Sequence, residues 1–207
     1  MTSATNYYVY AYVSAVSVVT LETSTTGHAT DSTAGNVGTE IKAADASRTL
    51  VGLVRPNAAV NFVNSVTQRL VLNWFNRRPL SMFAVFGGNA TTASGSLVEL
   101  DTDARIEFLA WGLDAALLWV HSRAYTGLLT ARAWLNLNLD GTSLGEFRSL
   151  TGTAVVNTEQ TGVHPYATIP SEANHTAYVY GAAPDGGTAT FIGGAAAKGG
   201  VGGIIYG

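Results

Sequence analysis

The chain has 207 residues, a formal net charge of −3 and 12% Asp, Glu, Lys and Arg, about half the share that is usual for a soluble globular domain. Its 11 Lys and Arg residues are scattered, which argues against nucleic acid as a partner, and the absence of cysteine excludes disulfides, thiolate catalysis and Cys-based zinc sites. No apolar run reaches a membrane-spanning length and the N-terminus lacks a signal-peptide pattern, so we expect no membrane insertion.

The low charge content has a consequence for assembly. A monomer with so few charged residues is poorly protected against self-association. We therefore expect identical subunits or a larger assembly to cover much of the surface. A building block of an assembly is a better expectation for this chain than an enzyme.

Apolar and polar residues alternate with a period of two along most of the chain, which predicts β-strands. In the first half we expect strands at 7–13, 16–23, 48–55, 68–76 and 80–86, and an exposed loop at 24–37. The range 68–76 also fits a helical spacing through Val66, Leu70 and Trp74. Its β-branched and aromatic residues and the nearby Pro79 favour a strand.

The second half continues the same alternation. Strands at 104–111 and 117–123 are expected to pair through a hairpin-sized connection, 112–115. The clearest strand is 129–139, in which one face carries Leu129, Ala131, Ala133, Leu135, Leu137 and Leu139. We then expect a weaker strand at 150–157, a loop at 158–171 containing Pro165 and Pro170, strands at 173–182 and 188–192, a glycine-rich passage at 193–203 and a last short strand at 204–206.

About ten to twelve strands with turn signals at short spacing predict an all-β fold, an antiparallel β-sandwich of jelly-roll type, with no need for a helix. No shift in composition marks a linker. Residues 1–207 are therefore expected to form a single β-sandwich domain with a short N-terminal arm, residues 1–6.

Several strings resemble one class of proteins and occur in a consistent order. They are YYVYAYVSAVSVVTLETSTTGHAT, DASRTLVGLVRPN, QRLVLNWFNRRP, ELDTDARIEFLAWG, GTATF and the terminal GGIIYG. Together they resemble tail-associated and capsid-associated structural proteins of tailed bacteriophages and their prophage relatives. The similarity covers most of the chain, and TLVGLVR and NWFNRR are its most specific parts.

This resemblance implies a trimeric β-sandwich knob with a jelly-roll arrangement similar to tumour-necrosis-factor-like domains, located in the virion. The expected function is a fibre tip that contacts a host-surface glycan through loops, with the homotrimer itself and other virion proteins as partners. Only about half a dozen residues precede the first predicted strand, whereas a fibre protein normally has a shaft before its knob. The chain is then either an excised tip or a compact capsid decoration subunit, and a carbohydrate-active enzyme on the same scaffold is the third alternative.

No catalytic or metal-binding motif is visible. The four histidines have no HxH or HExxH spacing, and Asp101 with Asp103 lacks the further acids of a calcium loop. There is no Gly-x-Ser-x-Gly elbow, and nothing singles out a carboxylate pair for glycoside cleavage. The glycines near the C-terminus lack the Lys-Ser/Thr ending of a phosphate-binding loop. We expect no enzymatic activity, no cofactor and no metal.

Aromatic residues are the remaining candidates for recognition, because they offer a stacking face and a polar tip that suit both subunit interfaces and sugar rings. Most of the four Trp and nine Tyr residues are expected in the core or at interfaces. Trp134, Arg132, Tyr178 and Tyr180 are our candidates for a subunit interface. Tyr125 and Tyr166 are our candidates for glycan binding, on the expectation that both lie in loops.

Overall fold

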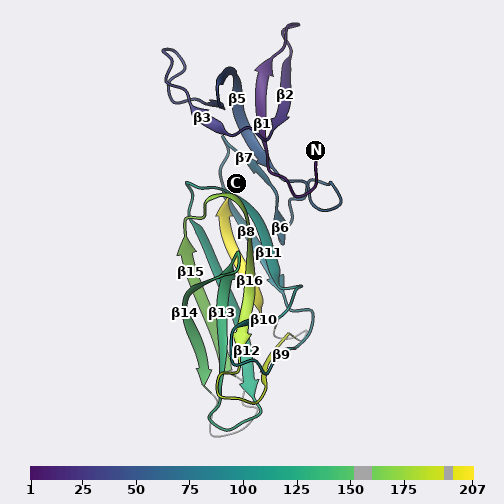
Figure 1. The fold of residues 1–207 in the computed structure, drawn as a ribbon, viewed down its shortest axis with the longest axis vertical. Coiled ribbons are helices and arrows are strands. Elements are labelled where there is room, and N and C mark those ends of the chain that lie inside the picture. The colour runs from purple at the N-terminus through teal and green to yellow at the C-terminus, as the bar shows by residue number, and fades with distance from the viewer. Residues whose placement is uncertain (152–159, 194–197) are drawn as a thin grey trace.

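The computed structural model describes residues 1–151, 160–193 and 198–207, with the backbone alone at 146–151 and 160. In these ranges the chain forms eighteen strands in three six-stranded sheets, and no helix. No described segment is therefore a helix long and apolar enough to cross a membrane. The molecule is elongated: one sheet lies at one end, and the other two are stacked beneath it (Figure 1).

The sheet at the end of the molecule is built from the N-terminal third of the chain. Its strand order is β2-β1-β5-β4-β3, with β7 paired to β5. The strands are β1 (Tyr7–Val13), β2 (Val19–Ser24), β3 (His28–Thr30), β4 (Glu40–Lys42), β5 (Asp45–Val54) and β7 (Val71–Asn73). We refer to it as the N-terminal sheet.

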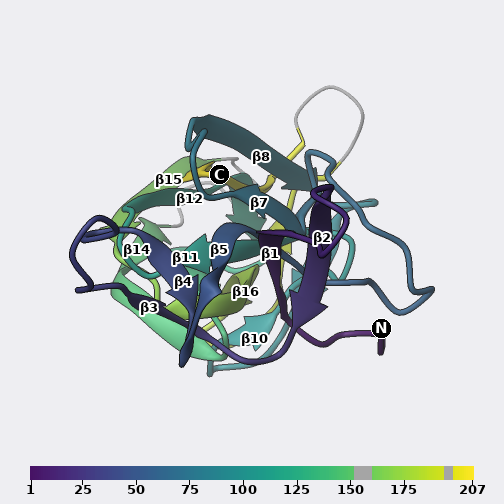
Figure 2. The same cartoon turned by 90° about the horizontal axis from the view of Figure 1, so that it is seen from above.

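The other two sheets pack face to face as a sandwich. One comprises β14 (Thr142–Thr151), β13 (Arg132–Leu139), β16 (Glu172–Ala182), β11 (Arg105–Trp111), β6 (Gln68–Arg69) and β10 (Val98–Glu99). The other comprises β8 (Pro79–Val85), β18 (Gly200–Tyr206), β12 (Ala116–Thr126), β17 (Ala189–Phe191), β9 (Ala90–Thr92) and β15 (Gln160–Thr168). Seen along the long axis, β15, β12 and β8 lie on one side and β14, β16 and β10 on the other (Figure 2).

The chain passes between the two sandwich sheets at β9–β10, β11–β12, β12–β13, β14–β15, β15–β16 and β16–β17, as it does in jelly rolls. All strand pairs are antiparallel except β6 with β11, which is parallel. The predicted all-β sandwich of jelly-roll type is confirmed. The strand number is higher than the expected ten to twelve, because short strands such as β3, β4, β9 and β10 carry too few residues to show an alternating pattern.

The sandwich core is filled by the inward-facing residues of both sheets. Leu135 and Leu137 of β13 are fully buried there, opposite Leu118 and Val120 of β12 on the other sheet. This confirms the predicted inner face of residues 131–139. Leu129, predicted on the same face, lies before β13 and is 56% exposed, so that part of the prediction was wrong.

A second, smaller cluster joins the N-terminal sheet to the sandwich. Leu109 and Trp111 lie on the outer face of β11, on the side opposite to Ile106 and Phe108. They pack against inward-facing residues of the N-terminal sheet, namely Tyr10, Leu50, Leu53 and Leu72. Strand β11 is therefore buried on both faces at this end.

The single domain of residues 1–207 with an N-terminal arm, residues 1–6, stays a prediction. Residues 1–6 precede β1. Within them, the Ala4 amide donates a hydrogen bond to the Pro56 carbonyl at 2.9 Å.

The predicted hairpin of 104–111 with 117–123 was wrong. Both segments are strands, but β11 pairs with β16 and β6, whereas β12 pairs with β15, β17 and β18 in the opposite sheet. Gly112 takes a positive φ of 71° in the connection. The turn therefore carries the chain from one sheet to the other instead of back along the same one.

The predicted loop at 158–171 was also wrong over most of its length. Residues 160–168 form β15, which pairs with β12 over nine positions, with Pro165 opposite Trp119. Among the described residues β15 has no strand on its other side, and proline is tolerated on such an edge because its missing N–H faces outward. The expected strand at 150–157 lies mostly outside the described residues.

Three smaller differences concern segment boundaries. The expected strand 68–76 is two strands, β6 and β7, in different sheets. The expected loop 24–37 contains β3, and the expected glycine passage 193–203, of which 194–197 lie outside the described residues, ends in the first part of β18. A strand can contain these glycines because both neighbouring strands project side chains over it, as described next.

A candidate ligand-binding groove on the outer face of β12

Strand β12 alternates strictly between buried and outward-facing side chains. Its outer row consists of Leu117, Trp119, His121, Arg123 and Tyr125, and the residues between them are buried. The neighbouring β18 has no side chains on this outer face beside the two rings, since Gly202 lies opposite Trp119 and Gly200 opposite His121. The aromatic row of β12 is therefore free to lean over β18.

The indole of Trp119 lies directly against the backbone of β18. A Cβ atom added at Gly202 would lie 2.5 Å from Cε2 of Trp119, closer than real Cβ atoms come to other heavy atoms. Glycine is thus required at this position for the close approach of ring and backbone. The position of the indole is set by a residue 83 places further along the chain.

His121 stacks with Phe83 across the same glycine strand. Phe83 belongs to β8, on the other side of β18, and is 43% exposed. The two ring centroids are 5.7 Å apart and the ring planes differ by 13°. The His121 ring is also held by its Nε2, which lies 3.0 Å from the Lys198 carbonyl oxygen. Trp119 and His121 of β12 and Phe83 of β8 thus form an aromatic row on the two strands that flank β18.

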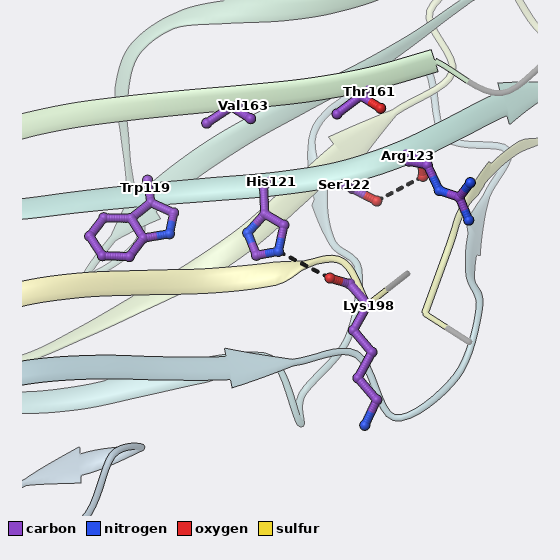
Figure 3. Close-up of a pocket in the computed structure, with 7 residues that line it drawn as sticks. All are labelled: Trp119, His121, Ser122, Arg123, Thr161, Val163 and Lys198. Carbon is purple, nitrogen blue, oxygen red and sulfur yellow. Dashed lines mark hydrogen bonds between the residues drawn. The ribbon is translucent and has the colours of Figure 1, made fainter. Parts of the chain in front are cut away.

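A groove of about 470 Å³ lies along this row. It is lined by Trp119, His121, Ser122, Arg123, Thr161, Val163 and Lys198 (Figure 3). Trp119 and His121 project from β12, and Val163 and Thr161 come from the neighbouring β15. We call it the Trp119 groove. Its size is within the usual range for small-molecule sites.

The groove combines apolar surfaces with hydrogen-bond donors. Aromatic rings and Val163 offer apolar faces, while Arg123, Lys198 and Thr161 offer hydrogen-bond donors. Among the described residues, the seven that line the groove include no Asp or Glu. Within the described residues, no group of three or more His, Asp or Glu side chains is arranged to hold a metal ion.

A second recess does contain two acids. It has a volume of about 510 Å³ on the outer face of β11 and β16 and is lined by Asp103, Arg105, Glu107 and Tyr178 among others. Glu107 accepts hydrogen bonds from Gln68 at 2.8 Å and from Asn174 at 3.1 Å. Both oxygens of Glu107 are thus already engaged by donors of the protein, which favours a structural carboxylate.

The two candidate glycan residues, Tyr125 and Tyr166, do not lie in loops, so that part of the prediction was wrong. Tyr125 belongs to β12 and continues the outer row beyond Arg123. Tyr166 belongs to β15 and lies opposite Leu118, and it packs against the sandwich core. The structure thus places Tyr125 on the face of the Trp119 groove and Tyr166 on the inner side of the same sheet. Their glycan-binding role stays a prediction.

The four candidate interface residues lie together on the outer face of the opposite sheet. Tyr178 and Tyr180 of β16 form an edge-on ring pair with centroids 6.2 Å apart. The Arg132 guanidinium lies 5.7 Å from the Trp134 ring and pairs with Asp185 through two hydrogen bonds of 2.6 and 2.8 Å. These bonds lower the pKa of Asp185 to about 2. Their role at a subunit interface stays a prediction.

A histidine between two carboxylates joins the N-terminal sheet to the sandwich. His28 Nδ1 lies 2.5 Å from Glu40 and its Nε2 lies 2.9 Å from Glu172 of β16. Burial lowers the pKa of His28, but the hydrogen bonds to Glu172 and Glu40 outweigh it and the net pKa is raised. The Tyr8 hydroxyl donates to the other oxygen of Glu172 at 2.6 Å, and burial together with this carboxylate raises the pKa of Tyr8.

Sequence reasoning did not identify the Trp119 groove. The strand predicted at 117–123 contains Trp119 and His121, but the partner strand β18 was expected to begin only at residue 204. The usable signal was the spacing of Gly200 and Gly202, two residues apart as on one face of a strand. Glycines at that spacing leave one strip of a sheet uncovered.

No protein-family model and no curated protein matches the chain. Solved structures with some similarity include VP2 of infectious bursal disease virus in a subviral particle, at 10% identity over 100% of this chain and 54% of VP2, with a TM-score of 0.40. A family 35 carbohydrate-binding module from Clostridium thermocellum has 14% identity, coverage of 62% and 95%, and a TM-score of 0.25. Dimeric latent PorU from Porphyromonas gingivalis has 6% identity, coverage of 64% and 13%, and a TM-score of 0.35. The chain spans about half of VP2 and a small part of PorU, and similarities this low assign it to none of these families.

Proposed function

We propose that the chain is a non-enzymatic structural protein of a bacteriophage virion, a homotrimeric fibre-tip subunit that contacts a host-surface saccharide. The string resemblance to phage tail and capsid proteins supports the virion location. The jelly-roll sandwich is compatible with it, because capsid subunits and lectins both use this architecture. The low charge content supports assembly with copies of itself.

The single observation that carries the saccharide part is the Trp119 groove. An indole held against a glycine strand and followed by a histidine ring gives an apolar row on a rigid sheet. Such a row fits the C–H faces of pyranose rings, while Thr161 and Arg123 supply polar contacts at its side. Because the site lies on strands, the recognition surface differs from the loops that the sequence suggested.

Arg123 and Lys198 give the groove a positive character without any lining carboxylate. A saccharide with acidic substituents, such as a uronic acid or a phosphorylated core sugar, is therefore the best-matched class. We propose an acidic surface polysaccharide as the ligand.

An array of bacterial lipopolysaccharides and capsular polysaccharides tests this proposal. We expect the wild-type chain to bind at least one acidic member, and Trp119→Ala to weaken that binding by about 2 kcal/mol, some thirtyfold. Trp134→Ala, which removes a tryptophan from the opposite sheet, is the matched control and should bind as the wild type does.

Two results would count against the saccharide assignment. One is the absence of binding to every array member by an assembled wild-type protein. The other is equal loss of binding in Trp119→Ala and Trp134→Ala, which would show a general effect on folding. If the protein binds no saccharide but attaches to phage heads, the capsid decoration alternative replaces the fibre tip.

A further inference from the structure

The β1–β2 hairpin has one face made of aliphatic side chains. Its register places Val13 opposite Val19 and Ala11 opposite Leu21, so these residues point to the same side. Val13, Val19 and Leu21 are 68%, 71% and 65% exposed. We call Ala11, Val13, Val19 and Leu21, together with Val16 and Val18 in the turn, the aliphatic face.

The turn extends this surface. Val16 is 77% exposed and Val18 is 56% exposed, and neither belongs to either strand. From residue 13 to residue 21 the chain contains no charged side chain. Five large aliphatic residues within nine positions are thus open to solvent, which is uncommon on a monomer.

All charge on the hairpin faces the other way. Glu22 of β2 is on the opposite face, where it accepts hydrogen bonds from Lys42 and, at 2.8 Å, from Arg48. The Arg48 guanidinium lies 3.8 Å from the Tyr12 ring centroid on that same side. The carboxylate of Glu22 thus has its hydrogen-bond partners within the N-terminal sheet, on the face of the hairpin opposite to the aliphatic face.

Strand β2 is also an edge strand. The order β2-β1-β5-β4-β3 leaves one side of β2 unpaired in the described chain. Edge strands that stay in solvent usually carry outward charges, prolines or bulges that prevent association. The residues of β2 on the aliphatic face, Val19 and Leu21, include no charged residue and no proline. This sequence is typical of a strand that another protein surface covers.

We propose that the aliphatic face is the surface through which copies of this chain associate, with the three aliphatic faces of a trimer meeting at its threefold axis. A second copy fits because it offers an identical uncharged apolar surface, so pairing brings no like charges together. A partner of another kind would normally be matched by charges at the rim of the surface, and residues 13–21 provide none. This inference rests on the self-association within the proposed function and names its location.

The hairpin is at the far end of the long molecule from β9, β10 and the loops below them (Figure 1). The Trp119 groove lies on the side of the sandwich, on strands that belong to another sheet. Association through the hairpins therefore leaves the groove of every copy accessible. Such an arrangement suits a fibre tip whose subunits associate at one end and bind saccharide on their lateral surfaces.

Cysteine cross-linking tests the inference directly, since the chain contains no cysteine of its own. Under mild oxidation we expect Val16→Cys to form covalent dimers at micromolar concentration, because the turns meet at the axis. Leu113→Cys, at a position in the β11–β12 connection that is 66% exposed, should form none. Cross-linking of both variants, or of Leu113→Cys alone, would overturn the assignment.

The second measurement is the molar mass of charge variants by light scattering after size exclusion. Leu21→Glu should weaken association more than about tenfold, because the charge would be buried without a partner. Leu113→Glu is the matched control, since Leu113 is 66% exposed and Leu21 65%, and it should keep the wild-type mass. Saccharide binding and circular dichroism of Leu21→Glu show whether the fold is retained.

The outcomes separate the two proposals. A monomeric wild type overturns both the homotrimer and the role of the hairpin. A trimeric wild type whose mass is unchanged by Leu21→Glu overturns only the hairpin. Dissociation by Trp134→Ala in place of Leu21→Glu would move the interface to the outer face of β13 and β16.

Discussion

His28 of the N-terminal sheet and Glu172 of the sandwich form an ion pair, with Nε2 2.9 Å from Oε2 and 144 positions between them in the chain. The second ring nitrogen faces Glu40 at 2.5 Å. Ionised carboxylates only accept hydrogen bonds, so both nitrogens must donate and His28 is an imidazolium in this arrangement. The protonated His28 ring thus pairs with Glu40 of the N-terminal sheet and with Glu172 of the sandwich.

The pH dependence of stability follows from this proton. The pKa of His28 is raised above its ordinary value of 6.5. Its ion pair with Glu172 therefore stabilises the folded state fully below pH 6.5, and this stabilisation is lost as the pH rises through the folded-state pKa. The pKa of Glu40 is lowered from 4.5. Glu40 therefore stabilises the folded state above pH 4.5, and this stabilisation is lost as the pH falls through its folded-state pKa. We expect the melting temperature to fall by about 2–4 °C between pH 6 and pH 8.5.

His28→Gln isolates this contribution. Scanning calorimetry from pH 5.5 to 8.5 should show that the variant is less stable than the wild type at pH 6 and that the difference shrinks toward pH 8.5. His121→Gln, which changes a histidine outside the junction, should keep the wild-type slope. A pH slope that is identical in His28→Gln and the wild type would show that the ion pair contributes nothing.

The buried face of β13 gives a second prediction. Leu135→Asp places an unpaired charge in the sandwich core, which costs more than about 4 kcal/mol, so we expect the variant not to fold. Leu129→Asp makes the same change at a position that is 56% exposed and should fold and melt as the wild type does. Soluble yield and circular dichroism measure both, and a folded Leu135→Asp protein would contradict the strand assignment.

Gly202→Ala tests how the Trp119 groove is built. The added methyl group would lie 2.5 Å from the Trp119 ring, so the indole must move away from β18. We expect saccharide binding to weaken at least about tenfold with a stability loss of about 1–3 kcal/mol. Gly88→Ala adds the same methyl group where no other atom lies within 4 Å, and should bind normally. Undiminished binding by Gly202→Ala would show that the position of the indole is irrelevant.

The sequence predicted the structure best for long strands of which only one face is buried. The alternation in 131–139 predicted the buried face of β13 because five apolar residues at every second position leave little ambiguity. The alternation in 104–111 likewise places Phe108 on one face of β11 and Leu109 with Trp111 on the other, as the structure does. It could not show that the second face of β11 is covered by the N-terminal sheet, since that contact joins residues far apart in the chain.

Local sequence patterns could not predict which strands pair with one another. A four-residue connection after Trp111 is compatible with a hairpin, but it equally serves a crossing to the other sheet, and tertiary packing decides between them. Pro165 suggested a loop because proline interrupts a central strand, and only the edge position of β15 permits it. The groove itself depends on Gly202 lying beside Trp119, a register that no local signal specifies.

The central claim is that this charge-poor chain covers its apolar surface with copies of itself, and sedimentation equilibrium of the wild-type protein at micromolar concentration tests it most directly. We predict a mass three times that of the 21.6 kDa chain. A mass of one chain at every concentration examined would contradict the account.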